Sequence, residues 1–534
     1  MTNNKRVVTY ALPYANGMLH LGHIMGMVQV DCYVRSLRMQ NIDVTFVCGD
    51  DAHGTPIMLN AMKQGISPEQ LIGQFYKEHV QDVRGFAISF DGYHTTHSML
   101  NTQIVHQVYH RLNQGNMIVQ KSIQQAYDVD QEMFLPDRYI KGECPKCGAQ
   151  DQYGDHCEVC GKTYAIKDLK SPVSIMSNTS PVWKESLHDF FRLSSEQGSV
   201  EQWLSGSDIQ ESVKNKLGEW FVEGLQDWDI TRDAPYFGIE IPNQPNKYFY
   251  VWLDAPFGYL SALGATLGLA EPQAIFDVWN DLNIEHFIGK DIVCFHGVFW
   301  PAVLKKAGLK APSKLHVHGF LTLAGDKMSK SRGRFVSTRD YLAKLPADML
   351  RYYFASRLST TVADVDLDWQ DFVLKVNADL VGKLANIGSR SQGFVHKYHE
   401  GCLGSRVDED FWQTLISRHE EIMASYQAVN LAQVCRLVME LCDETNQYVD
   451  HHKPWVLAKE GDQEQLLLVA TTALAAFRYL VYLLAPIIPN TAEKVAEAMG
   501  ESQPVLQLDP FVGMKVNKFG HLLSRVVKED VAFE

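Results

Sequence analysis

The amino-terminal part of the chain alternates between short apolar runs and a longer run with helical periodicity. "RVVTYALPY" predicts a buried strand. "IMGMVQVDCYVRSLRMQ" predicts a helix, because apolar residues recur at helical spacing, at Met27, Val30, Val34 and Leu37. "IDVTFVCGDDAHG" predicts a second strand with acidic residues at its carboxyl end. A strand, a glycine-containing turn, a helix and a strand form a right-handed βαβ unit, which indicates an α/β fold.

From about residue 376 the pattern becomes helical to near the end of the chain. In "LAQVCRLVMELCDETNQYV" the apolar residues Leu431, Val434, Val438 and Leu441 share one helical face. We therefore expect an all-α bundle to follow the α/β part.

One stretch, Leu466 to Ala485, is apolar over nearly the width of a membrane. Arg478 lies in its middle and would cost about 3 kcal/mol in lipid. A buried helix of the bundle is therefore the expectation, with no membrane partner. The first residues show no signal-peptide pattern, so a cytoplasmic protein with reduced cysteines is predicted.

Composition bounds the number of domains and the kind of charged partner. A chain of 534 residues is too long for one hydrophobic core, so several domains are expected. Hydrophobic residues make up 46% and charged residues 21%, which is typical of a globular protein. The net charge is −14, so a site for a polyanion has to be a local basic patch.

Residues 325–334, "GDKMSKSRGR", form such a patch. Five of these ten side chains are charged, and four of the five are positive. A charge run of this kind is most often a solvated surface, and the alternative is a flexible loop that closes on phosphate.

Four cysteines, Cys144, Cys147, Cys157 and Cys160, form two Cys-x-x-Cys pairs. Each pair presents two thiolates from a tight turn, and two pairs complete a tetrahedral zinc site. Disulfides and chance are the alternatives, and a reducing compartment disfavours disulfides. A site closed by four thiolates has no open position, so one structural zinc is predicted.

Two histidines, His20 and His23, fall at the start of the first predicted helix. Their spacing puts both rings on one side of the first turn, and Gly22 leaves room for a ligand beside the backbone. Ligands of parallel sheets bind at this edge, near helix N-termini. The alternative is two solvated helix-start histidines. The sequence has no G-x-x-x-x-G-K-[ST] phosphate motif.

These motifs together resemble a known family. "HLGH" at 20–23 resembles the HIGH signature of class I aminoacyl-tRNA synthetases, and "KMSKS" at 327–331 matches their second signature. Over essentially the whole chain, blocks such as "GDDAHGTPI", "WDITRDAPYFG", "YVWLDAPFGY" and "HFIGKDIVCFH" are similar to the methionyl-tRNA synthetase family.

The resemblance implies ATP-dependent ligation of L-methionine to elongator and initiator methionine tRNA through methionyl-adenylate, with Mg²⁺ accompanying ATP. It implies catalytic roles for His20, His23, Lys327 and Lys330. Implied ATP-binding residues are His20, Gly22, His23, Arg232, Asp291 and Lys330. Implied methionine-binding residues are Leu12, Tyr14, Asp51, Trp252, Ala255, Pro256, Tyr259, His296 and Trp300. Asp51 would receive the ammonium, while Leu12 and Tyr259 would contact the sulfur.

The resemblance also divides the chain. It implies a Rossmann-type catalytic domain in two halves (1–114 and 229–325), a connective zinc-knuckle insertion (115–228), a loop and helical junction (326–375), and an α-helical anticodon-binding domain (376–534). "YFYVWLDAP" and "KLHVHGF" are expected to return the chain to the catalytic sheet.

Three residues of the helical domain, Asn386, Arg390 and Trp455, match the family's anticodon-contacting positions. The family commonly has an asparagine one turn before Asn386, where this chain has Gly382. A monomer is expected, because the chain stops before the dimerising domain of many bacterial relatives.

Other functions are compatible with single motifs. A sibling synthetase for valine, isoleucine or leucine would carry a larger editing insertion than residues 115–228 allow. A small-molecule nucleotidyltransferase shares the paired histidines but does not need the helical part. A zinc-knuckle RNA-binding protein explains the cysteines but neither signature.

Overall fold

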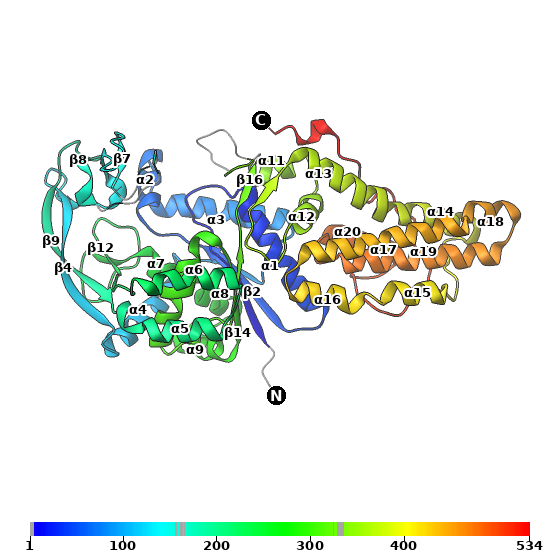
Figure 1. Ribbon diagram of the computed structural model, residues 1–534, viewed down its shortest axis with the longest axis horizontal. Helices are drawn as coiled ribbons and strands as arrows, with labels where there is room; N and C mark the ends of the chain where they lie inside the picture. Colours follow the sequence, from blue (N-terminus) through cyan, green and yellow to red (C-terminus); the bar gives the residue numbers. More distant parts are fainter. Residues whose placement is uncertain are drawn as a thin grey trace.

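The computed structural model describes residues 5–154, 157, 159–160, 164, 166–323, 325–327 and 336–533. Its centre is a six-stranded parallel sheet with the order β10-β15-β14-β1-β2-β3 (Figure 1). The strands are β10 (Asp208–Ile209), β15 (Lys314–His318), β14 (Asn283–Gly289), β1 (Arg6–Tyr10), β2 (Val44–Asp50) and β3 (Gly92–Thr95). Strand order reverses between β1 and β14, and ligands of parallel sheets bind outside the carboxyl ends at such a point.

Helices pack around this sheet and fix the loops at its carboxyl edge. The first, α1 (Leu21–Met39), is buried along most of its length, as the spacing of its apolar residues predicts. The others are α2 (Thr55–Gln64), α3 (Pro68–Gly85), α4 (Met99–Gln114), α7 (Val251–Asp254), α8 (Gly258–Thr266), α9 (Pro272–Asp281) and α10 (Trp300–Lys306). The predicted βαβ unit is therefore confirmed as β1–α1–β2.

The connective insertion projects from one end of the molecule as a long antiparallel ribbon (Figure 1). Its strands are β4 (Ile118–Asp128), β5 (Met133–Phe134), β9 (Val182–Phe191) and β11 (Trp228–Asp229). A smaller sheet of β6 (Ile140–Glu143), β7 (Gln152–Tyr153) and β8 (Lys170–Ser174) lies beside the cysteine motif.

The structure differs from the expected insertion boundary at residue 228. Within that range, β10 pairs with β15 and so extends the catalytic sheet. The flanking helices α5 (Gln197–Gly206) and α6 (Glu211–Val222) bury Leu204 and Leu217 in the catalytic core. Linear position could not show this, because the apolar faces of these helices find their partners only after the chain folds back.

The segment "YFYVWLDAP" also differs from its expected place in the main sheet. Its first residues end β13 (Lys247–Phe249), which pairs only with β12 (Thr231–Asp233), and the next residues form α7. The catalytic sheet instead receives β14 and, as expected from "KLHVHGF", β15. A short aromatic run fits a buried helix and a strand equally well, so periodicity could not separate them.

The carboxyl-terminal part is the predicted helical bundle (Figure 1). Its helices are α14 (Asn386–His399), α15 (Glu409–Ile416), α16 (His419–Gln427), α17 (Leu431–His452), α18 (Pro454–Glu460), α19 (Gln463–Leu483) and α20 (Pro489–Met499). By length and composition α19 is the one described helix that passes as a membrane span, and 89% of its apolar window is buried inside the protein. Arg478 is 2% exposed and pairs with Glu501, so α19 is the core helix expected from the sequence.

The helical pattern ends earlier than the sequence predicts. After Met499 the chain is mostly irregular and runs back to α13 (Trp369–Val376), which follows α12 (Ala347–Ala355) in the junction. Phe533 packs against Trp369, and the Val526 backbone bonds to Asn377. The apolar residues that anchor this extended segment are irregularly spaced. Their pattern has no period that would distinguish the segment from a helix.

A buried ion pair joins the two parts of the molecule. The Arg351 guanidinium on α12 lies 2.6 Å from the Asp31 carboxylate on α1, and both side chains are fully buried. Arg351 also donates to the carbonyls of Pro486 and Ile487, which precede α20. Since removing one partner of a buried pair is costly, this contact fixes how the bundle sits on the catalytic sheet.

Candidate active site

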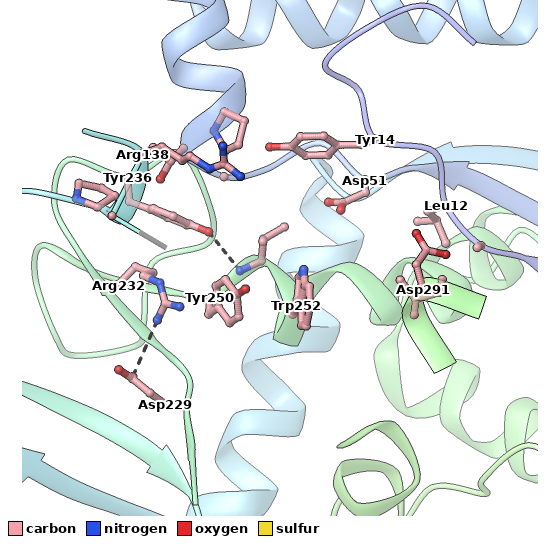
Figure 2. A pocket seen from close by; sticks show the side chains of 18 of the residues that line it. Leu12, Tyr14, Asp51, Arg138, Asp229, Arg232, Tyr236, Tyr250, Trp252 and Asp291 are labelled. Carbon is pink, nitrogen blue, oxygen red and sulfur yellow. Dashed lines mark hydrogen bonds and ion pairs between the residues drawn. The ribbon is translucent and has the colours of Figure 1, made fainter. Parts of the chain in front are cut away.

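A cavity of about 1380 Å³ opens at the carboxyl ends of β1 and β14. Its inner wall is formed by Leu12, Tyr14 and Asp51, and Asp291 lies at the end of β14 (Figure 2). Trp252, 47% exposed, stands between Asp291 and Arg232 in this view. The cavity therefore lies where strand order reverses, as a ligand site of this fold should.

The paired histidines cap α1 at the edge of this cavity. His20 Nδ1 accepts a hydrogen bond from the Gly22 N–H at 3.1 Å, and His23 Nδ1 accepts from the His20 N–H at 3.2 Å. The two rings lie 3.8 Å apart between centroids. Because Nδ1 accepts in each neutral ring, Nε2 carries the hydrogen and is the donor. The site thus combines two N–H donors with the positive end of a helix.

The first signature meets the segment that follows the second, although about 300 residues separate them along the chain. His20 forms an antiparallel backbone bridge with Ser337, just after the basic segment. Lys327 closes β17 (Asp326–Lys327), which pairs with β16 (Leu321–Leu323). Phe320 and Leu321 line the cavity, so the basic segment starts at its rim. Lys330 lies outside the residues that the structure describes.

Asp51 offers an acceptor inside the cavity. Its Oδ1 is buried and has no hydrogen-bond partner among the residues that the structure describes. Burial, followed by the charges of Asp254 and Asp50, raises the pKa of Asp51 well above its usual value. An unpartnered buried carboxylate is costly, and a cation delivered by a ligand would relieve that cost.

Arg232 faces the cavity from the opposite wall. Its guanidinium lies 3.8 Å above the Tyr250 ring and 3.9 Å from the Asp229 carboxylate (Figure 2). Both contacts hold the guanidinium group in place at the cavity wall. A guanidinium held in this way suits a phosphate or carboxylate ligand.

Five of the residues that the sequence predicted to bind methionine do not line the cavity of the described chain. They form a layer behind it and comprise Ala255, Pro256, Tyr259, His296 and Trp300. His296 Nδ1 donates to the Ile292 carbonyl, so its Nε2 accepts from the Tyr259 hydroxyl at 3.0 Å. Burial lowers the pKa of His296 to about 4, which keeps the ring neutral. The Trp300 indole donates to His286 at 3.1 Å.

The connective insertion contributes cavity residues that sequence reasoning missed. Arg138, Lys167 and Trp183 line the outer part of the cavity, and Trp183 is 43% exposed. A tryptophan at an exposed strand position was the available signal. The sequence positions of Arg138 and Lys167 gave no signal, because charged residues are common on any surface.

The four cysteines converge on one point. All four Sγ atoms lie within 4.8 Å of one another, with Cys144 to Cys160 at 3.9 Å and Cys147 to Cys157 at 3.6 Å. A tetrahedral zinc with bonds of about 2.3 Å requires sulfurs about 3.8 Å apart. The N–H groups of Cys147 and Cys160 donate to the first sulfur of their own pairs. The cluster is compatible with a structural zinc.

The residues matched to anticodon contacts lie on two neighbouring helices. The Arg390 guanidinium on α14 lies 5.4 Å from the centre of the Trp455 ring on α18. Arg390 also pairs with Asp450 at 2.9 Å, and Trp455 is 37% exposed. Asn386 begins α14, after the π-helical stretch Asn377–Ala385 that contains Gly382.

Comparison with known proteins agrees with this architecture. Residues 6–392 match the model of class I tRNA synthetases (M), and residues 408–523 match that of the anticodon-binding domain of tRNA ligases. A methionine–tRNA ligase of Francisella tularensis subsp. holarctica (strain FTNF002-00 / FTA) is 46% identical over 99% of this chain and 80% of its own length. That of F. tularensis subsp. tularensis (strain WY96-3418) has the same identity and coverage.

Solved structures share the fold. Mycobacterium tuberculosis methionyl-tRNA synthetase in complex with methionyl-adenylate has a TM-score of 0.80 at 24% identity, over 97% of this chain and 99% of that one. Its free-state structure has a TM-score of 0.73 at 22% identity, over 98% of both chains. The protein belongs to the class I aminoacyl-tRNA synthetases. Within that class it is an enzyme of the methionine–tRNA ligase family, which confirms the resemblance found in the sequence.

Proposed function

We propose that this protein ligates L-methionine to its cognate tRNA in two steps within the cavity. In the first step, methionine and ATP form methionyl-adenylate and pyrophosphate. In the second, a terminal ribose hydroxyl of the tRNA attacks the adenylate carbonyl, and AMP leaves. The observation that carries this proposal is the bridge between His20 of the first signature and Ser337, just after the second, beside a cavity into which a buried carboxylate presents one oxygen without a partner among the described residues.

The first step needs positioning and charge stabilisation. The carboxylate of methionine is already ionised, so its oxygen attacks the α-phosphorus directly and the bond to pyrophosphate breaks. In this proposal the Nε2–H groups of His20 and His23 donate to phosphate oxygens from one side. Lys327 and Lys330 approach from the other side. Mg²⁺ that accompanies ATP would supply further neutralisation of phosphate charge.

Residues of the cavity walls orient the substrates in this proposal. Asp51 receives the ammonium of methionine, and Leu12, Tyr14 and Trp252 cover the amino acid. Arg232 and Asp291, at opposite ends of Figure 2, contact the nucleotide in this proposal. Tyr259, His296 and Trp300 form the apolar floor that a thioether would reach if Leu12 or Trp252 moved aside. Sulfur against aromatic rings is favourable by about 0.3–1.5 kcal/mol per contact.

Exchange of labelled pyrophosphate into ATP tests this function. The assay is run with each of the twenty amino acids, and we expect exchange with methionine far above that with the others. Valine, isoleucine or leucine as the preferred substrate would identify a sibling synthetase. Absence of exchange with all twenty would contradict the proposed function.

The cysteine cluster is proposed to hold one structural zinc per chain. Cys157→Ala is expected to release the metal and loosen the connective insertion, because metal binding and local folding are coupled. The catalytic core should keep its main thermal transition. Metal analysis of the purified protein and variant measures the stoichiometry.

Cys402→Ala is the matched control for this experiment. Cys402 is an exposed cysteine outside the cluster, so this variant should retain its zinc. Stoichiometric zinc in Cys157→Ala would show that the ligands are wrongly assigned.

The helical bundle is proposed to recognise the anticodon through Arg390 and Trp455. Unpaired RNA bases stack on aromatic rings and guanidinium planes, and this pair presents both. Trp455→Ala should lower aminoacylation of methionine tRNA about 10- to 100-fold, because stacking contributes about 1–3 kcal/mol per base. Pyrophosphate exchange, which needs no tRNA, should not change.

Trp412→Ala is the control that shows the effect of replacing a tryptophan with a purely structural role. Trp412 belongs to the same bundle and is 2% exposed, so Trp412→Ala should lower the melting temperature. If Trp455→Ala behaved in the same way, with equal losses in both assays, Trp455 would be a packing residue.

A further inference from the structure

Helix α3 contacts the turn before the first signature and the helix that follows the second. Its residue His79 is fully buried and lies between the end of β2 and the turn before His20. Glu78, the preceding residue, and Asp82, about one turn later, pair with Arg339 on α11 (Thr338–Leu342), the helix that follows the basic segment.

His79 makes one hydrogen bond through each of its two ring nitrogens. Its Nε2 lies 2.8 Å from the Gly17 carbonyl, which can only accept, so Nε2 carries a hydrogen. Its Nδ1 lies 2.8 Å from Asp50 Oδ1, which also accepts a hydrogen bond from the Tyr93 hydroxyl. Both ring nitrogens therefore face acceptor groups, an arrangement that suits the doubly protonated ring.

The electrostatic surroundings agree with this geometry. Burial alone lowers the pKa of His79, but the bond and charge of Asp50, the bond to Gly17 and the charge of Asp82 together raise it above its usual value. The His79 ring bridges a strand end and a loop within the core. Such a buried contact permits only one arrangement of its partners without large cost.

The bond to Gly17 restrains the loop that presents His20 and His23. That loop is also held at its start, where the Ala15 N–H donates to the Asp51 carbonyl at 2.8 Å. Between Gly17 and the helix the backbone has three residues in which to turn. Fixing Gly17 therefore fixes the entry of α1 relative to Asp51.

A second contact of α3, the ion pairs of Glu78 and Asp82 with Arg339, restrains the segment after the basic loop. Arg339 Nε lies 3.3 Å from Asp82 Oδ1, and its NH2 lies 3.4 Å from Glu78 Oε2. Gly85 allows the close approach of α11, because a Cβ there would meet Leu342 at 2.5 Å. Ser337, which bridges His20, caps α11 through Asp340.

We propose that His79 and Arg339 are positioning residues, through which α3 holds the two signature segments in the relation that adenylate formation requires. This inference rests on the function proposed above. Neither residue lines the cavity of the described chain, so each acts through the backbone it restrains. A displacement of about 1 Å at a reacting group can cost about 100-fold in rate, which sets the scale of the effect.

Two substitutions of His79 separate positioning from packing. The amide nitrogen of asparagine takes the place of Nδ1, so His79→Asn keeps the bond to Asp50 and loses the bond to Gly17. The amide nitrogen of glutamine reaches the place of Nε2, so His79→Gln keeps the bond to Gly17. We expect kcat of methionine-dependent pyrophosphate exchange to fall about 10- to 100-fold in His79→Asn. His79→Gln should stay within about threefold of the wild type, as its loop contact survives, and KM for methionine should change little in both.

A packing role predicts the opposite order. Asp50 is the charged partner of His79, so His79→Asn, which retains that bond, would then be the more stable and more active variant. Melting temperatures are measured on both. His79→Asn at least as active as His79→Gln would overturn the inference.

His316→Asn is the matched control for a buried imidazole–carboxylate pair. His316 lies 3.0 Å from Glu285 on the neighbouring strand of the catalytic sheet, and its ring packs against Phe287 and Tyr33. Its replacement should lower the melting temperature and leave exchange unchanged. Equal losses of exchange in His316→Asn and His79→Asn would show a general effect of core damage and overturn the inference.

Arg339 gives an independent variant, because its side chain is 44% exposed and its replacement should fold. Arg339→Gln should lower kcat of exchange about tenfold, and Arg339→Lys should recover part of it. Arg38→Gln, which breaks a surface pair with Asp91 at 2.6 Å, is the control. Unchanged exchange in Arg339→Gln would overturn the positioning role of the contact between Arg339 and α3. An inactive wild type would instead overturn the proposed function, and this inference with it.

Discussion

Asp51→Asn is expected to lower kcat/KM for methionine in pyrophosphate exchange by at least about 30-fold. The substitution keeps the shape of the side chain and removes the charge that the ammonium would meet in a buried site. Loss of one partner of such a pair costs about 2–5 kcal/mol, and about 1.4 kcal/mol corresponds to tenfold. KM for ATP should change much less.

The melting temperature of Asp51→Asn should not fall. Burial and the neighbouring Asp254 raise the pKa of Asp51, so the folded state binds its proton more tightly than the unfolded chain does. Ionising this carboxyl therefore lowers stability as pH rises from the unfolded pKa through the folded one. Asparagine carries no charge and avoids that cost. A drop in both activity and melting temperature would indicate a structural defect instead.

The same raised pKa predicts a pH dependence of methionine binding. The ionised carboxylate attracts the ammonium, and the protonated form does not. The dissociation constant of methionine should therefore rise as pH falls through the raised pKa of Asp51. Asp51→Asn should show no such dependence on this group.

Asp43→Asn is the matched control. It changes an acid at the other end of the same strand region, whose side chain is 65% exposed. Both its kinetics and its pH profile should match the wild type. Full methionine affinity in Asp51→Asn would contradict the proposed role of Asp51.

Lys330→Ala is expected to raise the barrier to adenylate formation by about 2–4 kcal/mol, or about 30- to 1000-fold in the exchange rate. In the proposed reaction Lys330 meets charge that develops as pyrophosphate departs, so its contribution is largest in the transition state. kcat should therefore fall while the affinity for methionine stays nearly constant. Single-turnover adenylate formation and methionine binding measure the two quantities separately.

Lys63→Ala tests whether the loss of any lysine has this effect. Lys63 is exposed near the end of α2 and lies outside both signatures. Its replacement should leave exchange unchanged. An unchanged rate in Lys330→Ala as well would make the segment at residues 325–334 an ordinary solvated surface.

The sequence by itself determined those features that depend on local spacing. The β1–α1–β2 unit follows from the alternation of apolar periods. The positions of Cys144 and Cys160 at the ends of one motif already implied a compact thiolate cluster. His20 and His23 share one helical turn because they are spaced i, i+3. Each of these relations spans few residues, so backbone geometry alone sets it.

Tertiary structure decided everything that depends on where distant segments meet. β10 joined the catalytic sheet, and "YFYVWLDAP" did not become one of its strands, because packing rather than periodicity selected their partners. Asp51 has an unpartnered oxygen, and His79 bridges Asp50 and Gly17, because folding brings these groups together in a buried environment. Burial and pairing are properties of three-dimensional neighbours, and the order of residues along the chain does not contain them in readable form.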